Sequence, residues 1–452
     1  MSDDQILRLE IVVFPDAGRP SMFADGVYPS VATVNDFAAN PSRQIECARK
    51  LGVRDFTIDK IGRFSISASI EAEKFKEFFE TELVEEERAD DVRSLAPPPG
   101  AAFRVPEIDG LETIIERAYV QRPPHYFAGE RILPPESVPP FGDDKFRLRV
   151  PDDVALLMQA RTVHQRGIFG RGVTVAMPDN GFFKHPYFDA HGYNYLAIAA
   201  PDAIDYETDL SGHGTGISAN LLAVAPGVNF IGIKQVNKTL GFKTAVEMGP
   251  DVISCSWAAE LEENSPTLPN NLKPFHLTVL DAIARGIVVC VAAGNGGVKG
   301  FPGSIPEVIS VGGVYVDRDL NYRASDHTSG FDSTWFPGRQ TPDLCGLCGS
   351  KAEEDYITLP VPQAAHGGSA ARDGWFAFSG SSSATPMVAG ICALLKEVKP
   401  GLSPQEIKNL LKYTARDITS GMNANGRKAR PGPDGAVGYG LADAARAVDA
   451  VT

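Results

Sequence analysis

The spacing of apolar residues predicts a small α+β unit at the start of the chain. Ile6 to Phe14 form an apolar run typical of a strand, and the stretch from Phe56 to Ile70 alternates apolar and polar positions, which is the period of a half-buried strand. Helical spacing predicts one helix over Pro41 to Leu51 and another over Glu71 to Glu82. A short strand at Leu83 to Glu87 is the candidate for the last element of this unit.

A Pro-rich stretch follows. Residues 96 to 141 contain PPPG, RPPHYF and LPPESVPPF, and proline removes backbone donors and fixes φ, so this stretch is a stiff connector or a strap on a surface. One amphipathic helix is predicted inside it, over Glu107 to Tyr119. The chain therefore divides into an N-terminal domain over residues 1–95, a linker over 96–145 and a larger domain over 146–452.

The larger domain shows short apolar runs that alternate with helices, the signature of a parallel sheet with covering helices. The predicted strands are Val173 to Met177, Asn229 to Ile233, Val252 to Ser254, Ile287 to Ala292 and Val308 to Val311. The predicted helices are Asp153 to Gln165, Gly214 to Leu222, Pro274 to Arg285, Ala384 to Val398 and Pro404 to Tyr413. This domain is expected to be of the α/β class.

Composition and charge exclude several classes of function. With 43 Lys and Arg against 57 Asp and Glu the net charge is −14, and no Lys/Arg-rich run is present, which argues against a nucleic-acid partner. The N-terminal sequence MSDDQILRLEIVVFPD has acidic residues where a secretory signal needs Lys or Arg, and its apolar run is short and interrupted by charge. No stretch approaches the ~18 apolar residues of a membrane span. We therefore expect a cytoplasmic protein without a membrane partner.

The six cysteines are too sparse for a disulfide framework. A CxxC motif is present, but no second CxxC or HxxxH supplies the remaining ligands of a structural zinc site. The other four lie in apolar or helical contexts, where cysteine usually acts as a small buried hydrophobe. No metal-ligand set and no cofactor are predicted. The motif is Cys345 and Cys348, and the others are Cys47, Cys255, Cys290 and Cys392.

Four polar residues stand at positions where polar side chains are costly unless they are used. Asp179 follows the apolar strand VTVAM, and Asn295 follows VVCVAAG; open parallel sheets place their sites at such strand ends. His213 lies in SGHGTG before a helix, and Ser382 lies at the start of a helix, whose positive end favours developing negative charge. Taken alone, Asp179, His213 and Asn295 are better explained as turn or loop residues, whereas for Ser382 the functional interpretation is stronger than that of a helix cap. Together, the order Asp, His, Ser with an Asn donor is one of the known solutions to acyl transfer.

With these residues in place, the chain resembles the subtilisin-like serine proteases, the subtilases, over roughly Asp152 to Val451. Val173 to Gly181 with His185 and Pro186 is similar to the family's aspartate segment, and GHGTG at 212–216 to its histidine segment. GSSSATP at 380–386, followed by VAG, is similar to its serine segment. The resemblance implies a subtilisin-like three-layer parallel-sheet catalytic domain, preceded by a small ferredoxin-like, pro-domain-like domain.

The resemblance also implies a serine endopeptidase and a role for each residue. Ser382 would attack the scissile carbonyl, His213 would take its proton, and Asp179 would orient the imidazole. Asn295 would donate its amide to the oxyanion. The N-terminal domain would guide folding or act as an intramolecular inhibitor. An extended peptide substrate would add as a strand to an edge formed by Ser256, Trp257, Ala258 and Gly294.

Departures from the family's usual pattern qualify this hypothesis. Met177 and Pro178 precede Asp179 where the family generally has a simpler apolar pair, and Asn180 follows it where Ser or Thr is usual. Trp257 with Ala258 replaces a smaller Leu-Gly pair, which predicts a narrowed or occluded specificity cleft.

Three questions stay open at this level. The stretch Cys345 to Ala377 is interpreted as an insertion that is a lid, a substrate exosite or a disordered loop. Calcium is common in the family and is kept as an alternative to the absence of a cofactor, although no Asp-rich loop resembles a dedicated calcium site. The complete set of four residues favours an active endopeptidase of restricted specificity, with neutral or basic peptides preferred because the chain is acidic. The alternative is an obstructed pseudoprotease that acts as a peptide-binding or regulatory protein.

Overall fold

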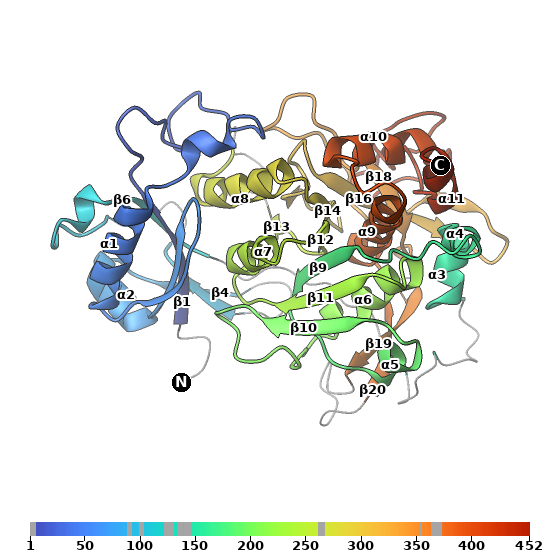
Figure 1. Ribbon diagram of the computed structural model, residues 1–452, viewed down its shortest axis with the longest axis horizontal. Helices are drawn as coiled ribbons and strands as arrows, with labels where there is room; N and C mark the ends of the chain where they lie inside the picture. Colours follow the sequence, from blue (N-terminus) through green and yellow to red (C-terminus); the bar gives the residue numbers. More distant parts are fainter. Residues whose placement is uncertain are drawn as a thin grey trace. The chain divides into compact units, whose positions relative to one another are not determined.

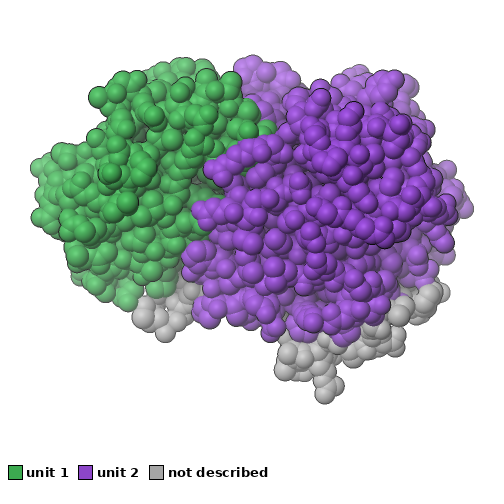
Figure 2. All heavy atoms as spheres, in the orientation of Figure 1, with its two compact units in different colours: residues 1–124, 236–243, 267–284 green, residues 125–235, 244–266, 285–452 purple. Residues whose placement is uncertain are grey.

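The computed structural model describes residues 6–87, 93–98, 104–121, 131–132, 139, 146–260, 267–352, 355–362 and 373–452 (Figure 1). The chain falls into two compact units (Figure 2). The first comprises residues 1–124, 236–243 and 267–284, and the second comprises residues 125–235, 244–266 and 285–452. The first unit thus includes two segments from the middle of the sequence. The domain limits at residues 95 and 146 stay predictions.

The first unit is built on an antiparallel four-stranded sheet of order β2-β3-β1-β6. This order, with one helix after β1 and one after β3, is that of the ferredoxin-like α+β domain that the sequence predicts. Its elements are β1 (Ile6–Val13), η2 (Val34–Phe37), α1 (Pro41–Gly52), β2 (Thr57–Ile61), β3 (Ile66–Glu71), α2 (Ala72–Phe79), η3 (Leu111–Thr113), β6 (Ile115–Val120), η4 (Asn270–Leu272) and α8 (Lys273–Ala284). A separate two-stranded sheet pairs β4 (Val84–Glu87) with β5 (Arg93–Ala96).

Two predictions for this region are wrong. The residues of the predicted helix over Glu107 to Tyr119 instead form η3 and β6, and β6 pairs antiparallel with β1. The spacing of apolar residues does not show that the edge of β1, which is distant in the sequence, offers backbone hydrogen bonds to this segment. The β-branched and aromatic residues of β6 favour a strand once that edge is available. The predicted last strand at Leu83 to Glu87 does not close the sheet, because β4 pairs with β5 and β6 takes the edge beside β1.

The second unit contains an eight-stranded sheet of order β10-β11-β9-β12-β14-β16-β17, with β18 also paired to β16. All pairs are parallel except β16 with β17. This confirms the predicted α/β class. The strands are β9 (Thr174–Asp179), β10 (Tyr195–Ala199), β11 (Asn229–Lys234), β12 (Val252–Cys255), β14 (Val288–Ala292), β16 (Ile309–Val316), β17 (Tyr322–Ala324) and β18 (Leu344–Leu347).

A second, smaller sheet in this unit has the order β7-β20-β19-β8. Its strands are β7 (Arg131–Ile132), β8 (Leu148–Arg149), β19 (Ile357–Pro362) and β20 (Asp373–Phe378), and the short pair is β13 (Ala259–Glu260) with β15 (Gly300–Phe301). The helices are α3 (Asp152–Leu157), α4 (Ala160–His164), α5 (Pro186–Ala190), α6 (His213–Val224), α9 (Ser381–Val398), α10 (Pro404–Thr414) and α11 (Ala444–Asp449). The helix α7 (Lys238–Glu247) contributes residues to both units.

The core of the second unit explains why two helices lie where they do. α6 is buried along its whole length and α9 from Ser381 to Lys396, because both consist almost entirely of apolar and small residues. α9 packs against α6 and against β12, β14 and β16. The two helices thus pack against each other, and both begin at the carboxyl ends of the parallel strands.

Two more predictions need correction here. The helix expected over Asp153 to Gln165 is two helices, α3 and α4, separated where Gln159 adopts a φ of 60°. The stretch from Cys345 to Ala377 is not simply a loop insertion, since it includes strand residues of β18, β19 and β20. Its residues 353–354 and 363–372 lie outside the described part of the chain. In the described ranges, no helix has both the length and the apolar character needed to cross a membrane.

Candidate active site

Asp179 is the last residue of β9 and lies at the carboxyl edge of the parallel sheet. Its side chain is fully buried, and Oδ1 lies 2.8 Å from Nδ1 of His213. Oδ1 also accepts a hydrogen bond of 2.8 Å from the backbone N–H of Asn180. A carboxylate on Nδ1 selects the tautomer in which Nδ1 donates, which leaves Nε2 able to accept a proton.

His213 is the first residue of α6, directly after Gly212, which has a φ of 68°. The helix start is fixed to the Asp179 segment, because the Asn180 side-chain oxygen accepts from the Gly214 N–H at 3.1 Å. Gly214 has no side chain because none fits: a Cβ there would lie 2.3 Å from the Gly181 carbonyl oxygen. Asn180, a departure from the family's usual residue, thus has a definite role in joining β9 to α6.

Ser382 is the second residue of α9 and is 3% exposed. The turn before it is formed by Gly380, whose φ of 95° disfavours any other residue. Asn220 of α6 donates its amide to the Ser383 carbonyl at 3.1 Å, so the helix that begins with His213 is bonded beside the serine. The Ser382 hydroxyl donates to the carbonyl oxygen of Ser256 at 2.7 Å. It must therefore rotate before it can give its proton to an imidazole.

Asn295 lies beyond the end of β14 with its side chain oriented by Ser381. The Asn295 Oδ1 accepts from the Ser381 backbone N–H at 2.8 Å and from the Ser381 hydroxyl at 3.0 Å. Because the oxygen is held in this way, the amide nitrogen is the end left to donate to an oxyanion. Ser381 thus orients the side chain of Asn295 through both its backbone and its hydroxyl.

The predicted substrate edge lies between these groups. Ser256 follows β12, and its carbonyl oxygen contacts the Ser382 hydroxyl. Gly294 donates its N–H toward the Ser381 hydroxyl at 3.3 Å. Trp257 is 1% exposed and donates its indole N–H to the Pro178 carbonyl oxygen at 2.9 Å, while Ala258 is partly exposed. That these residues bind substrate, and that Trp257 narrows the cleft, remain predictions.

Asp209 is a second buried carboxylate beside this site, and sequence reasoning missed it. It is 3% exposed, and its Oδ2 accepts from the backbone N–H and the hydroxyl of Thr215 in α6. Burial raises its pKa to about 6, with the charge of Asp179 adding to the rise and the two Thr215 hydrogen bonds opposing it. It lies among other acidic residues in the loop before His213, so nothing in the sequence distinguishes it.

The raised pKa of Asp209 predicts a pH-dependent stability. Between pH 3.8 and about 6 the folded chain keeps this proton and the unfolded chain releases it, so the free energy of unfolding falls as pH rises through that window. The fall amounts to about 3 kcal/mol. We expect Asp209→Asn to remove this dependence of the unfolding free energy on pH. At pH 7 the variant should unfold at a higher urea concentration than the parent. Urea unfolding of the Ser382→Ala chain, with and without the substitution, measures it. Asp189→Asn, at an exposed position, serves as the control. An equal slope of unfolding free energy against pH in the Asp209→Asn and Asp189→Asn variants would contradict the prediction.

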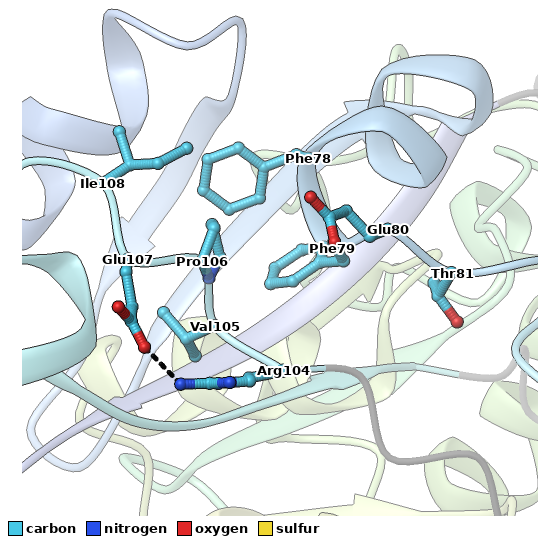
Figure 3. A pocket seen from close by; sticks show the side chains of 9 residues that line it. All are labelled: Phe78, Phe79, Glu80, Thr81, Arg104, Val105, Pro106, Glu107 and Ile108. Atoms are coloured by element: carbon cyan, nitrogen blue, oxygen red, sulfur yellow. Dashed lines mark hydrogen bonds and ion pairs between the residues drawn. The ribbon is translucent and has the colours of Figure 1, made fainter.

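A pocket of about 580 Å³ lies in the first unit, far in sequence from these residues (Figure 3). Its walls come from the end of α2 and from residues 104–108, and they combine two phenylalanine rings with an Arg104–Glu107 ion pair. None of the candidate catalytic residues lines it. The lining residues are Phe78, Phe79, Glu80, Thr81, Arg104, Val105, Pro106, Glu107 and Ile108.

In chemical terms, the site combines a buried Asp–His pair, a serine at a helix start and an oriented amide donor. Within the described part of the chain, no group of three or more His, Cys, Asp or Glu side chains is arranged to hold a metal ion. Cys345 and Cys348 are buried as free thiols, with Cys345 in β18 and the Cys348 sulfur accepting from the Gly380 N–H at 3.1 Å. Cys348 thus contacts the serine turn, whereas the Cys345 sulfur donates to the Val437 carbonyl oxygen at 3.4 Å.

Comparison of the sequence with known proteins agrees with the chemistry of this site. A model of the Subtilase family matches residues 170–440. The serine protease AprX of Bacillus subtilis is 30% identical over 285 residues, which cover 54% of this chain and 61% of AprX, less than two thirds of its length. Subtilisin BL of Lederbergia lenta is 27% identical over 58% of this chain and 90% of its own. An intracellular serine protease of Paenibacillus polymyxa is 32% identical over 51% of this chain and 68% of its own.

Proposed function

The chain belongs to the subtilase family of serine proteases, and on that premise we propose that it is an endopeptidase that forms an acyl-enzyme on Ser382. The observation that carries the proposal is the buried 2.8 Å contact between His213 and Asp179. It lies at the start of a helix that packs against the helix of Ser382.

The proposed reaction gives each side chain of the site a defined role. Binding of the substrate main chain at the Ser256 carbonyl would free the Ser382 hydroxyl to turn toward His213. His213 takes the proton at Nε2 as Ser382 attacks, and Asp179 stabilises the resulting imidazolium. Asn295 and the Ser382 backbone N–H donate to the oxyanion. His213 then protonates the leaving amine, and water hydrolyses the ester.

We further propose a restricted specificity for neutral or basic peptides. The net charge of −14 supports this preference. So does the loop that leads into His213, where the exposed Ile204 and Leu210, 94% and 74% accessible, flank the exposed Glu207. A peptide with apolar and basic side chains would match this loop in both polarity and charge.

An intracellular site of action is part of the proposal. One of the similar proteins is named an intracellular serine protease, although others are subtilisins. The six cysteines, all buried as free thiols, are compatible with a reducing compartment.

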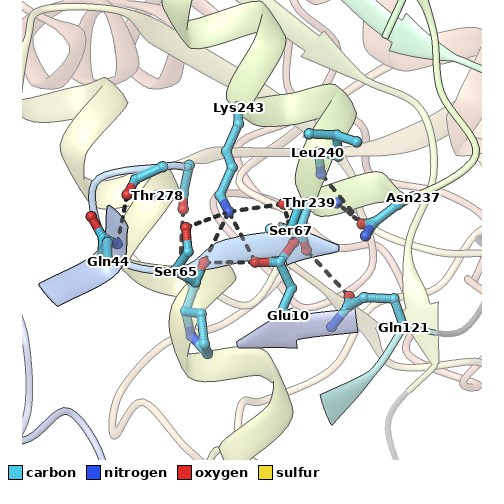
Figure 4. Close-up of polar contacts among 12 residues, drawn as sticks. Glu10, Gln44, Ser65, Ser67, Gln121, Asn237, Thr239, Leu240, Lys243 and Thr278 are labelled. Atoms are coloured by element: carbon cyan, nitrogen blue, oxygen red, sulfur yellow. Dashed lines mark hydrogen bonds and ion pairs between the residues drawn. The ribbon is translucent and has the colours of Figure 1, made fainter. Parts of the chain in front are cut away.

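The N-terminal domain is proposed to guide folding of the protease or to inhibit it. Support comes from within the first unit, where the N-terminal sheet binds residues of the family-matched region (Figure 4). Lys243 of α7 donates to Glu10 of β1 at 2.9 Å, and also to Ser65 and Ser67. A Cβ at Gly62 would lie 2.8 Å from Cε of the Lys243 side chain, so the absence of a side chain at residue 62 makes room for the lysine.

A fluorophosphonate probe read by intact-mass spectrometry tests the proposed function. We expect one adduct on the wild-type chain and none on Ser382→Ala, with Ser420→Ala, at an exposed position, as the control that stays labelled. Loss of N-terminal mass in wild type but not in Ser382→Ala would show self-processing, whereas an intact mass in both would favour a retained regulatory domain. Absence of labelling after removal of the N-terminal domain would favour the obstructed pseudoprotease.

A further inference from the structure

Trp257 and Pro178 are bonded to each other, and both distinguish this chain from its family's usual pattern. The indole N–H of Trp257 donates to the Pro178 carbonyl oxygen at 2.9 Å, and both residues are buried. Pro178 directly precedes Asp179. The bond therefore fixes the peptide unit that carries the carboxylate of the proposed triad.

The sheet explains why this carbonyl needs a donor. Thr174 presents its carbonyl toward the β12 side, where it accepts from Asp251, whereas Val173 and Asp179 present theirs toward β11 and accept from Asn229 and Gln235. Residues two apart in a strand face the same neighbour, so the Pro178 carbonyl faces β12.

The pairing of β12 with β9 ends at Ile253 and Ala176, two residues before Pro178. A proline is tolerated at this point because β9 no longer pairs with β12 here, so no backbone N–H is required on that side, although the pairing with β11 continues to Asp179. A buried carbonyl without a donor is destabilising, and the Trp257 indole supplies the donor after the strands diverge.

The residue before Trp257 contacts the other end of the site. The carbonyl oxygen of Ser256 accepts from the Ser382 hydroxyl at 2.7 Å. Trp257 thus binds the segment of Asp179 through its side chain, and Ser256, the residue before it, binds the nucleophile Ser382 through its backbone. A shift of this segment changes the positions of Asp179 and Ser382 together.

We propose that Trp257 is a positioning residue, whose indole N–H holds the Pro178–Asp179 peptide and thereby sets the orientation of His213. This inference rests on the proposed function of Asp179, His213 and Ser382. It assigns the indole a role in the chemical step, in addition to any steric effect of Trp257 on the cleft.

The test replaces Trp257 by benzothienylalanine, which has nearly the same shape as tryptophan but no N–H, and in parallel by 4-fluorotryptophan, which keeps it. We expect the benzothienyl variant to lose roughly 10- to 100-fold in kcat with KM changed less than twofold, because misplacement of reacting groups lowers the rate and leaves binding intact. The fluorotryptophan variant is expected to retain wild-type kcat. Thermal unfolding of both variants checks that the fold is kept.

The same pair of replacements at Trp375, which is fully buried in β20, is the control and should change neither constant. Equal kcat in the two Trp257 variants would overturn the inference, as would a change confined to KM, which would assign Trp257 to substrate binding. If Ser382→Ala stays active or wild type is inactive, the proposed function fails and this inference fails with it. A labelled, active wild type with an unaffected benzothienyl variant overturns the inference alone.

Discussion

Replacing His213 with alanine should lower kcat/KM for peptide hydrolysis by roughly 10⁶-fold, the scale known for removal of the serine or histidine of the subtilisin triad. The physical reason is that the Ser382 hydroxyl then has no base to take its proton and the leaving amine has no acid. Asp179→Asn should cost less, about 10⁴-fold, because the imidazole remains but loses the carboxylate that selects its tautomer.

Steady-state hydrolysis of a peptide library substrate gives these ratios. His191→Ala provides the matched control, since His191 lies on the exposed surface of the same unit, where its Nδ1 donates to the Tyr187 carbonyl oxygen. Its activity should stay within twofold of wild type. A His213→Ala chain that keeps more than a hundredth of the wild-type rate would remove His213 from the proposed mechanism.

Replacing Lys243 with methionine should destabilise the first unit by about 3–5 kcal/mol, the cost of breaking a buried ion pair by removal of one partner. Lys243 and Glu10 are 4% and 1% exposed, and the two Glu10 oxygens also accept from Ser65 and Ser67 at 2.6 Å. Without the lysine, the Glu10 carboxylate stays in a buried place with two hydroxyl donors and no counter-charge.

Hydrogen exchange of β1 and β3 in the Ser382→Ala chain measures this loss locally. The double variant Glu10→Leu with Lys243→Met should recover at least half of it, because no buried charge then remains unpaired. Lys76→Met is the control: the Lys76–Glu73 pair has the same 2.9 Å separation but is exposed, and no measurable change is expected. Equal protection in the Lys243 and Lys76 variants would contradict the argument.

The site was predictable from the sequence to the extent that it depends on strand ends and helix starts. Asp179 and Asn295 were identified because each follows an apolar strand, and His213 and Ser382 because each opens an apolar helix next to glycine. The family match confirms the resemblance on which their roles rest. The catalytic roles themselves await the experiments above.

The burial and the hydrogen-bond partners of individual side chains were not predictable in this way. Asp209 is acidic among acidic residues, and only its burial beside Thr215 distinguishes it. Trp257 was interpreted as an obstruction of the cleft, because the sequence does not show that β12 leaves β9 before Pro178 and that a donor is needed there.

The N-terminal sheet shows the same division most clearly. Period-two alternation over residues 64–70 correctly predicted a strand, since successive side chains must point to opposite faces. The alternation is that of a half-buried strand, yet Ser65 and Ser67 on its polar face are also fully buried, against Glu10 and Lys243. The sequence by itself determined the elements, the fold class and the order of the reactive residues, because these follow from local periodicity and short motifs. Only the tertiary structure decided what covers each face and which buried polar groups share a partner, because such contacts depend on how separate segments pack, as Lys243 does on Glu10 across 233 positions.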